Sequence, residues 1–497
     1  MRRKILYALS LAAVIALFVI NALLSYGYDD EVYNFFMVEK LNSVSSIISY
    51  ANSTDFHPSG MYIINYLMLK LFGSWSLVKA AGAFLSAFSV WLYWYFMSRN
   101  IRGNMVLFFS FIVICLNPSV LMWCTSVRWY KYIMPLICVI SLLIHFSGRE
   151  NFKPLCLWGI YFLACLLMFH INYLSAVVII ISFLFMLYGR RKFLRSEWKC
   201  VAGLSILSLL LVSYQAYILL TVHYAKSRQA FQFLRFSVAG AMNYLQGSAI
   251  IPVSAWGIMF IVANLILILV FLKNIAEMIR NSDNNFFMSS YASVMVLFPG
   301  AIKDVRNFTI LSPELGMFLT NIYAKIQHKL LKILVLSLFT LGTAGGIFNV
   351  LTHNDTAKVT YNMPYPEIMK CVERLDPQKE ALFITNLPGA YYFIGKNYPN
   401  AVLVPDGFAK SGIWAPFFPD WYSTLENWKG KIIAVRTHQG LVSKDDYTKY
   451  TEYLEGSNII ERHRIGLDRF ASFKRRFYSE YPDYYARVYL IDNGGAQ

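Results

Sequence analysis

Long apolar runs separated by short polar loops fill the first 350 residues of the chain. A helix that crosses a bilayer needs about 20 mostly apolar residues, and about 17 is the practical minimum. Runs of this length lie near positions 4–26, 75–97, 105–124, 129–147, 154–170, 171–188, 200–222, 253–273, 285–301, 308–324 and 332–350. The pattern predicts a polytopic α-helical membrane protein with about 11 spans, within a range of about 10 to 13.

The first run follows a basic start, "MRRK", and continues to residue 24. A secretory signal peptide usually has a shorter apolar core, followed by a cleavage site of small residues. No convincing cleavage site follows this run, so we interpret it as an uncleaved first span.

Beyond residue 350 the pattern changes to short β-type runs punctuated by Pro and Gly. The stretch "DYTKYTEYLEG" (446–456) predicts a helix among them. We therefore expect a membrane domain over 1–350, with a long first outer loop at 27–74, and a small extracytoplasmic α/β domain over 351–497. The predicted strands of that domain are 381–386, 401–405, 431–437, 458–465 and 486–492.

Composition supports a membrane protein. The chain is 57% hydrophobic and 15% charged, whereas a soluble globular protein has about 25% charged residues. Its net charge of +17 does not indicate nucleic acid, because the basic residues are spread among short loops between apolar runs. None of the seven cysteines has the spacing of a Cys-x-x-Cys or Cys/His metal site, which argues against a disulfide framework or a zinc site.

The positive-inside rule orients the spans. With Arg2, Arg3 and Lys4 in the cytoplasm, four of the five loops that fall on the cytoplasmic face are net basic, and the fifth, 273–285, is neutral. An odd number of spans then places the C-terminal domain outside a cell (inner) membrane. The cytoplasmic loops are 98–104, 147–153, 188–199, 273–285 and 324–332.

The predicted outer face carries more basic residues than this rule leads us to expect. An excess of cations on that face indicates an anionic ligand, for which phosphate is the natural candidate. The outer segments are 27–74, 117–132, 169–173, 221–247 and 299–308. Their basic residues include Arg128, Lys131, His170, His223, Lys226, Arg228, Arg235, Lys303 and Arg306.

Three consecutive acids, Asp29, Asp30 and Glu31, lie in "SYGYDDEVYNFF" (25–36) at the start of the first outer loop. They could form a solvated loop at a helix end, or a general base or metal-binding pair at the membrane surface. The sequel "NSTDFHPSGMYIINYLMLKLFG" (52–73) favours the second interpretation. It contains a His-Pro turn and an amphipathic helix over 61–71, which is too short to span and is expected to lie along the interface.

These segments resemble the GT-C class of polyprenyl-phosphate-sugar-dependent glycosyltransferases. The closest resemblance is to the bacterial relatives of protein O-mannosyltransferases and lipid A aminoarabinose transferases. Three later segments are similar to motifs of that branch: "SVRWYKYIMPLICVISLL" (126–143), "FHINYLSAVVII" (169–180) and "VRNFTILSPELGMFL" (305–319). "HPSG" departs from the branch by lacking a second Pro, and "NF" follows Arg306 where Tyr is usual. The resemblance covers roughly the first 350 residues.

The resemblance implies roles for individual residues. Asp30 would be the catalytic base and Glu31 its neighbour, although the extra acid Asp29 allows a register shifted by one. His57, Arg128, Tyr130 and Arg306 would bind the phosphate of the donor.

The chemistry suits these residue types. A sugar hydroxyl has a high pKa, so it benefits from a carboxylate base as it attacks the anomeric carbon. A phosphate leaving group needs its charge stabilised by fixed cations, and the planar guanidinium of Arg suits this role. One carboxylate therefore suffices, and in-line displacement would invert the sugar. No cofactor is required by the sequence, while three adjacent acids keep a divalent cation compatible with it.

Structural interpretations compete with each of these roles. Arg128 and Lys131 could anchor a helix end by snorkelling, His170 could be an ordinary interfacial histidine, and Tyr130 could belong to an aromatic belt. Glu314 follows Pro313 about two turns into a predicted span. An intramembrane carboxylate is a candidate functional residue, although an internal ion pair would also explain it.

We therefore expect an inverting membrane glycosyltransferase whose partners are a polyprenyl-phosphate sugar donor, membrane lipids and an extracytoplasmic glycan, lipid or protein acceptor. The alternative is a transporter or flippase for a lipid-linked glycan, since such proteins place ionisable groups near the midplane. A membrane scaffold is a third interpretation, but it leaves the acidic loop and the basic outer face unexplained.

Overall fold

The computed structural model describes residues 2–25, 29–53, 57–149, 153–173, 175–221, 255–280, 309–351, 365–404, 421–437, 444–466 and 485–493. The chain divides into two compact units, each with its own core. The first comprises Met1–Leu24 and Leu41–Leu351, and the second comprises Ser25–Lys40 and Thr352–Gln497.

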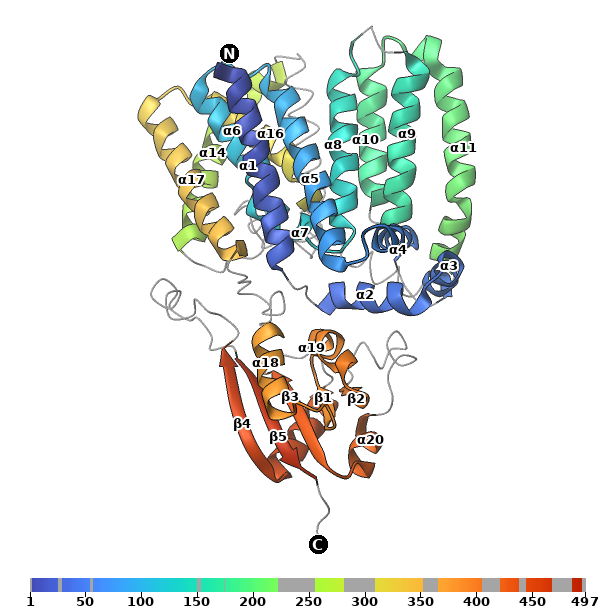
Figure 1. The fold of residues 1–497 in the computed structure, drawn as a ribbon. Helices are drawn as coiled ribbons and strands as arrows, with labels where there is room; N and C mark the ends of the chain where they lie inside the picture. The colour runs from blue at the N-terminus through green and yellow to red at the C-terminus, as the bar shows by residue number, and fades with distance from the viewer. Residues whose placement is uncertain are drawn as a thin grey trace. The chain divides into compact units, whose positions relative to one another are not determined.

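The first unit is a bundle of apolar helices (Figure 1). Six described helices are long and apolar enough to cross a membrane, and four shorter apolar helices accompany them. This confirms a multi-pass membrane protein, although the total of about 11 spans stays a prediction because the run 285–301 lies outside the described residues. The bundle helices are α1 (Arg2–Leu24), α5 (Trp75–Ser98), α6 (Asn104–Cys115), α7 (Pro118–Cys124), α8 (Tyr130–Phe146), α9 (Pro154–Ile171), α10 (Ser175–Gly189), α11 (Leu194–Thr221), α14 (Ala255–Arg280), α16 (Ser312–Ala324) and α17 (Lys329–Leu351).

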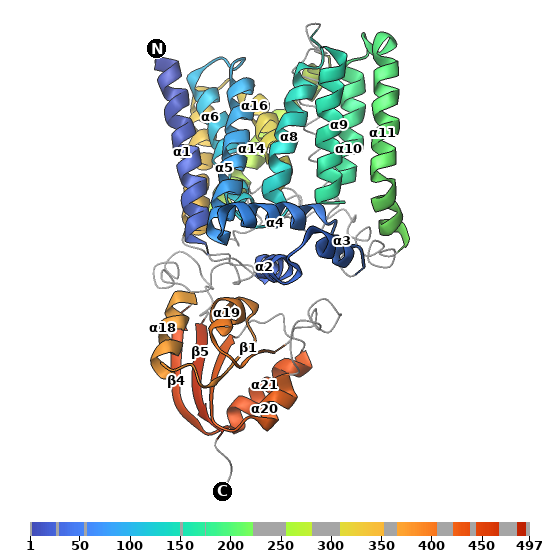
Figure 2. The same cartoon turned by 45° about the vertical axis from the view of Figure 1, so that its right-hand side comes forward.

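The bundle has two groups of helices. Helices α1, α5, α6, α7, α14, α16 and α17 enclose the main core, where Phe109 stacks on Tyr323 at 4.1 Å between ring centroids. Helices α8 to α11 lie side by side in the other group, and α8 packs on α5 to join the two (Figures 1 and 2).

The predicted span 105–124 is one of the six, over Asn104–Cys124, and its helix is interrupted within the span. The apolar run 105–124 forms two helices, because Asn117 caps a new helix and its side-chain oxygen accepts bonds from the N–H groups of Ser119 and Val120. Pro118 occupies the first turn of α7, where its missing N–H has no cost. A capping Asn followed by Pro is a strong local start signal, and it outweighs the continuous apolar pattern.

A buried ion pair joins the ends of α8 to α11 on the predicted cytoplasmic side. The guanidinium of Arg190 makes a bidentate contact with the Glu197 carboxylate, in which Nε and Nη2 donate to the two oxygens. Its Nη1 donates to the carbonyls of Ser147 and Arg149 at 2.9 Å. The Trp158 indole donates to Glu197 Oε2 at 2.8 Å. Arg190 and Glu197, which lie in the predicted basic loop 188–199, are thus buried, whereas most other residues of this loop are exposed.

Two shorter helices of this unit lie in the predicted first outer loop, α3 (Val44–Ser53) and α4 (Gly60–Phe72). Helix α4 matches the predicted interfacial helix and ends at Gly73, whose φ of 72° is the left-handed conformation that closes many helices. It runs across the ends of the bundle helices (Figure 2) and contacts α5 and α9.

The second unit contains a five-stranded sheet of order β2-β1-β3-β5-β4. Strands β2, β1 and β3 are parallel, β5 pairs antiparallel with β3, and β4 pairs antiparallel with β5 at the sheet edge. All five predicted strands are present, as is the helix predicted at 446–456. The elements are α18 (Tyr365–Leu375), β1 (Leu382–Thr385), α19 (Pro388–Phe393), the 3₁₀ turn Gly395–Asn397, β2 (Ala401–Leu403), α20 (Trp421–Asn427), β3 (Lys431–Thr437), α21 (Lys444–Gly456), β4 (Ile459–Gly466) and β5 (Tyr485–Asp492).

Both faces of this sheet are covered (Figure 2). Helices α18 and α19 cover the face that carries Phe383 and Ile433, and α20 and α21 cover the face that carries Leu382 and Ile432. Successive strand residues point to opposite faces, so a strand with two covered faces must be apolar throughout. This explains why Leu382–Ile384 of β1 and Ile432–Val435 of β3 are apolar without a break, whereas the edge strand β4 is largely exposed and carries charged residues.

Helix α2 (Asp29–Leu41) differs from the expected domain assignment. We predicted that the whole first outer loop, 27–74, would belong to the membrane domain. Residues Ser25–Lys40 instead group with the C-terminal sheet domain, and the loop returns to the membrane unit at Leu41.

Candidate active site

The acidic triplet forms the first turn of α2. Asp29, Asp30 and Glu31 are its first three residues. The predicted loop acids therefore begin a helix. Glu31 is only 2% exposed and begins a stretch of eight buried residues.

The other end of α2 is joined to the C-terminal domain. Phe35 and Phe36 contact the ring of Tyr392 at centroid distances of 5.4 and 5.0 Å. The Tyr392 hydroxyl donates a hydrogen bond to Glu39 Oε1. Residues 35, 36 and 39 share one helix face, because positions three and four apart are neighbours on a helix.

The His-Pro turn lies against the end of α9. His57 is half-buried two residues before Ser59, the residue that precedes α4. A Cβ atom on Gly60 would lie 2.3 Å from the carbonyl oxygen of His170, so only glycine fits there. The motifs that contain His57 and His170, which are 113 residues apart in the sequence, are thus brought together by the close approach of Gly60 to the His170 backbone. The sequence analysis did not identify Gly60 as a site residue.

The Arg-x-Tyr motif forms the turn between α7 and α8. Arg128 is 8% exposed in this turn, and Tyr130 is the first residue of α8. The Tyr130 ring lies 5.4 Å from Trp123 and 3.9 Å from Trp129. The ring is therefore packed in an aromatic cluster, while its motif partner Arg128 is largely withdrawn from solvent.

Lys131 is fully buried and faces α5. Its Nζ donates to the Val78 carbonyl at 3.4 Å, and its side chain lies so close to Gly82 that a Cβ there would be 2.4 Å from Lys131 Cδ. Ser86 Oγ donates to the Lys131 carbonyl at 2.9 Å. Lys131 therefore packs between helices rather than snorkelling to the surface.

The same end of α8 is tied to the interfacial helix. The Tyr132 hydroxyl donates to Asn65 Oδ1 at 2.6 Å, and Asn65 is a fully buried residue of α4. Neither residue was among the predicted site residues. The signal was present in the sequence, since Asn65 is a polar residue within the apolar run "MYIINYLMLKLF".

Glu314 is fully buried in the first turn of α16, which begins at Ser312. The prediction placed it about two turns into a span, and the later helix start corrects this. The hydroxyl groups of Ser141 and Tyr93 face its carboxyl group from α8 and α5. A Cβ on Gly316 would lie 3.0 Å from the Val113 carbonyl oxygen, so α16 approaches α6 closely beside the acid.

The remaining basic residues of the predicted outer face lie outside the described residues; they are His223, Lys226, Arg228, Arg235, Lys303 and Arg306. Within the ranges that the structure describes, no three His, Cys, Asp or Glu side chains gather as metal ligands.

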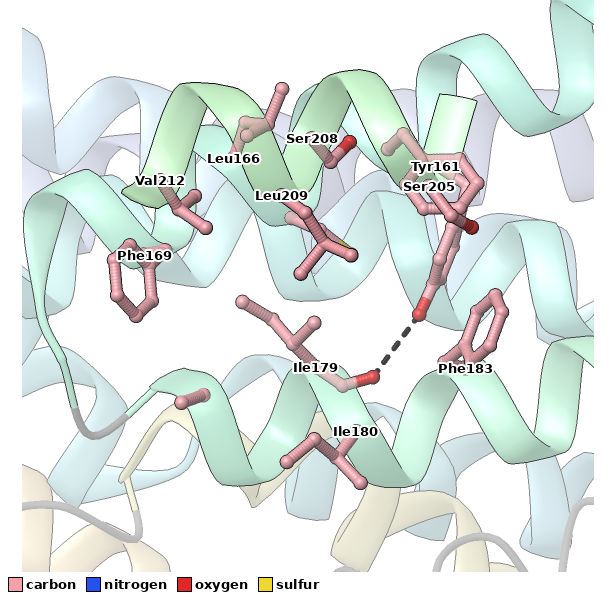
Figure 3. A pocket seen from close by; sticks show the side chains of 13 residues that line it. Tyr161, Leu166, Phe169, Ile179, Ile180, Phe183, Ser205, Ser208, Leu209 and Val212 are labelled. Carbon is pink, nitrogen blue, oxygen red and sulfur yellow. Dashed lines mark hydrogen bonds between the residues drawn. The ribbon is translucent and has the colours of Figure 1, made fainter. Parts of the chain in front are cut away.

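An apolar pocket of about 330 Å³ opens between α9, α10 and α11 (Figure 3). Its walls are mostly aliphatic and aromatic, with Phe169, Ile180 and Leu209 among them, and Ser205 and Ser208 also line it. The hydroxyl of Tyr161 reaches the Ile179 carbonyl at 3.2 Å, so this polar atom is already paired within the protein. The pocket can accept a hydrocarbon chain but offers little to a polar ligand.

Comparison of sequences finds no match, either among models of known protein families or among functionally characterised proteins. Comparison of folds aligns the chain with the crystal structure of ArnT from Cupriavidus metallidurans in the apo state, over 100% of both chains, with a TM-score of 0.60 and 12% identity. The same protein bound to undecaprenyl phosphate aligns over 99% of both chains, with a TM-score of 0.57 and 11% identity. The predicted fold, a polytopic helical membrane domain with a small C-terminal sheet domain, is thereby confirmed and is similar to that of ArnT.

Proposed function

We propose that this protein transfers a sugar from a polyprenyl-phosphate donor to an extracytoplasmic acceptor. The observation that carries the proposal is the full-length fold likeness to ArnT, one structure of which is bound to undecaprenyl phosphate. The acidic triplet on the first turn of α2 and the buried Arg128 are the residue types that such a transfer needs.

In the proposed reaction, the acceptor hydroxyl attacks the anomeric carbon while Asp30 accepts its proton. A new glycosidic bond forms as the bond from the anomeric carbon to the phosphate oxygen breaks. The bonding electrons leave with the polyprenyl phosphate, and the configuration at the anomeric carbon inverts. Arg128, His57 and Arg306 would stabilise the phosphate charge, which is usually a large part of such catalysis.

The apolar pocket between α9, α10 and α11 supports the proposal that the donor carries a polyprenyl chain. It lies among helices whose outer residues are strongly exposed, as Ile180 is at 62% and Leu209 at 66%. In a bilayer such residues face lipid, so a chain could enter the pocket from the side. We assign the pocket to part of the polyprenyl chain of the donor.

The test is transfer by the purified protein in detergent, with a panel of undecaprenyl-phosphate hexoses and pentoses labelled in the sugar. We expect transfer or donor hydrolysis with at least one donor. Replacement of Asp30 by Asn should lower the rate by about 10²–10⁴-fold, the usual contribution of a general base. Asp29→Asn is the matched control and should leave the rate within about threefold of wild type.

Two outcomes would contradict the proposal in different ways. No turnover with any donor would refute the glycosyltransferase. A large loss in Asp29→Asn with none in Asp30→Asn would show that the register is shifted by one and that Asp30 is not the base.

Glu314 favours the second candidate, a transporter or flippase for a lipid-linked glycan, because buried intramembrane carboxylates often mark transport pathways. The two functions separate in proteoliposomes. A flippase would move a labelled undecaprenyl-phosphate sugar across the bilayer without cleaving it and would lose this activity in Glu314→Gln. The glycosyltransferase would release undecaprenyl phosphate.

A further inference from the structure

The helix that carries the acidic triplet has its tertiary anchor in the C-terminal domain. Helix α2 groups with Thr352–Gln497 rather than with the membrane helices. Its contacts with α19 come from two aromatic residues and one acid: Phe35 and Phe36 meet Tyr392, and Glu39 accepts the Tyr392 hydrogen bond. Tyr392 is therefore the centre of the contact.

Helix α19 is held in place by its packing in the core of the C-terminal domain. It directly follows β1, and three residues of its segment, Leu387, Ala390 and Ile394, are buried in the core formed with α18 and the sheet. A Cβ on Gly389 would clash with the ring of Tyr365, so α19 is packed tightly against α18. With this side in the core, the other side presents its aromatic residues to α2.

The aromatic residues of α19 form a continuous cluster with α2. Tyr391 lies 5.8 Å from Phe36 and Phe393 lies 6.4 Å from Phe35, with Tyr392 between them. Burial raises the pKa of the Tyr391 hydroxyl above its usual value, which favours its neutral form. Aromatic contacts of this kind each contribute beyond their buried area.

The acids and the anchor lie on one short helix. Asp30 and Phe35 are five residues apart, which is about 7.5 Å along a helix axis. A helix of this length moves as a rigid body, so a displacement at Phe35 is carried to the first turn. Misplacement of a catalytic group by about 1 Å can cost about 10²-fold in rate.

We propose that Tyr392 is a positioning residue, which holds α2 on the C-terminal domain and thereby sets the place of the acidic triplet. The C-terminal domain is then part of the catalytic apparatus and not only a cap or an acceptor-binding module. This inference rests on the proposed function, because the catalytic role of the acidic triplet is part of that function.

Variants of Tyr392 and Glu39 distinguish the contribution of the Tyr392 ring from that of its hydrogen bond to Glu39. Tyr392→Phe keeps the aromatic contacts and removes the bond to Glu39, whereas Tyr392→Ala removes both. Glu39→Gln keeps an acceptor oxygen for Tyr392. Tyr398→Phe is the matched control, because Tyr398 is buried in the same domain and stacks on Phe383 at 5.4 Å instead of on α2.

The first measurement is amide hydrogen exchange of the full-length protein in detergent, followed over residues 31–38. We expect faster exchange in Tyr392→Ala and little change in Tyr398→Phe. Unchanged exchange in Tyr392→Ala would overturn the inference, because α2 would then be held by other contacts.

The second measurement is turnover of the undecaprenyl-phosphate sugar that the wild-type protein accepts. We expect kcat to fall about tenfold in Tyr392→Phe and roughly 10²-fold in Tyr392→Ala, with the donor KM unchanged. Glu39→Gln should stay within about threefold of wild type, since its acceptor remains. Wild-type kcat in Tyr392→Ala would overturn the inference.

The two proposals fail separately. A wild-type protein without turnover refutes the proposed function, and hydrogen exchange still decides whether Tyr392 holds α2. An active wild-type protein with normal exchange and rate in Tyr392→Ala refutes only the positioning role.

Discussion

The buried pair of Arg190 and Glu197 makes a sharp test of how the helices α8 to α11 are held together. Both side chains are 2% exposed. Arg190 bonds to the Glu197 carboxylate and to two main-chain carbonyls, and Trp158 adds a bond to the same carboxylate. Arg190→Met removes all the bonds of the guanidinium and leaves Glu197 as a buried charge with the Trp158 bond.

We expect Arg190→Met to lower the free energy of unfolding by about 3–5 kcal/mol, the usual cost of removing one partner of a buried pair. The double variant Arg190→Met with Glu197→Gln should lose less, because the stranded charge is gone and a Gln oxygen can still accept from Trp158. Isosteric removal of both charges is often close to neutral.

The assay is unfolding in mixed detergent–SDS micelles, followed by tryptophan fluorescence and extrapolated to zero SDS. Arg191→Met is the matched control, since Arg191 is an exposed neighbour and its loss should change stability by at most about 0.5 kcal/mol. A loss below about 1 kcal/mol in Arg190→Met, or a double variant less stable than this single variant, would refute the reasoning.

Three further predictions concern the site and its orientation. Gly60→Ala should destabilise the protein by about 1–3 kcal/mol and lower turnover, because its Cβ would meet the His170 carbonyl; thermal unfolding and donor hydrolysis measure both effects. Leu209→Trp should fill part of the pocket between α9, α10 and α11 and raise the KM for a polyprenyl-phosphate donor with kcat unchanged. Alkaline phosphatase fused after Gln497 should be active in cells, because the charge pattern places this end outside.

Each of these has a result that would contradict it. Wild-type stability in Gly60→Ala would mean that α4 does not approach α9 so closely. Gly73→Ala cannot serve as the control for this variant, because Gly73 has a positive φ. Gly203→Ala is the better control, since a Cβ there meets no atom within 4 Å. An unchanged KM in Leu209→Trp would remove the pocket from the donor site, and an inactive phosphatase fusion would reverse the predicted topology.

Much of the fold could be predicted because its signals are local. Apolar runs marked the membrane helices, since the bilayer requires a fixed length of apolar residues wherever the helix packs. The five strand runs of the tail and the helix at 446–456 were also found, because β-type residues bounded by Gly and Pro carry their own signal. The interfacial helix α4 was predicted from its length and its pattern.

The candidate site was predicted only in part. The positions of the acids and of Arg128 followed from motifs, but the pattern did not show that Lys131 is buried against Gly82 or that Gly60 must meet the His170 carbonyl. Nor did it show that Asn65 would be the partner of Tyr132. Each of these contacts joins residues from different helices, and no local pattern encodes which helix faces which.

The sequence by itself determined which segments are long and apolar enough to cross a membrane, which form strands, and where the acidic triplet and its basic counterparts occur, because hydrophobic length, periodicity and charge act within a few residues. Only the tertiary structure decided that the helix bearing the triplet belongs with the C-terminal domain. That assignment depends on Glu39 and Tyr392, which are 353 positions apart. Their contact exists only once the sheet has folded and turned the aromatic side of α19 toward α2.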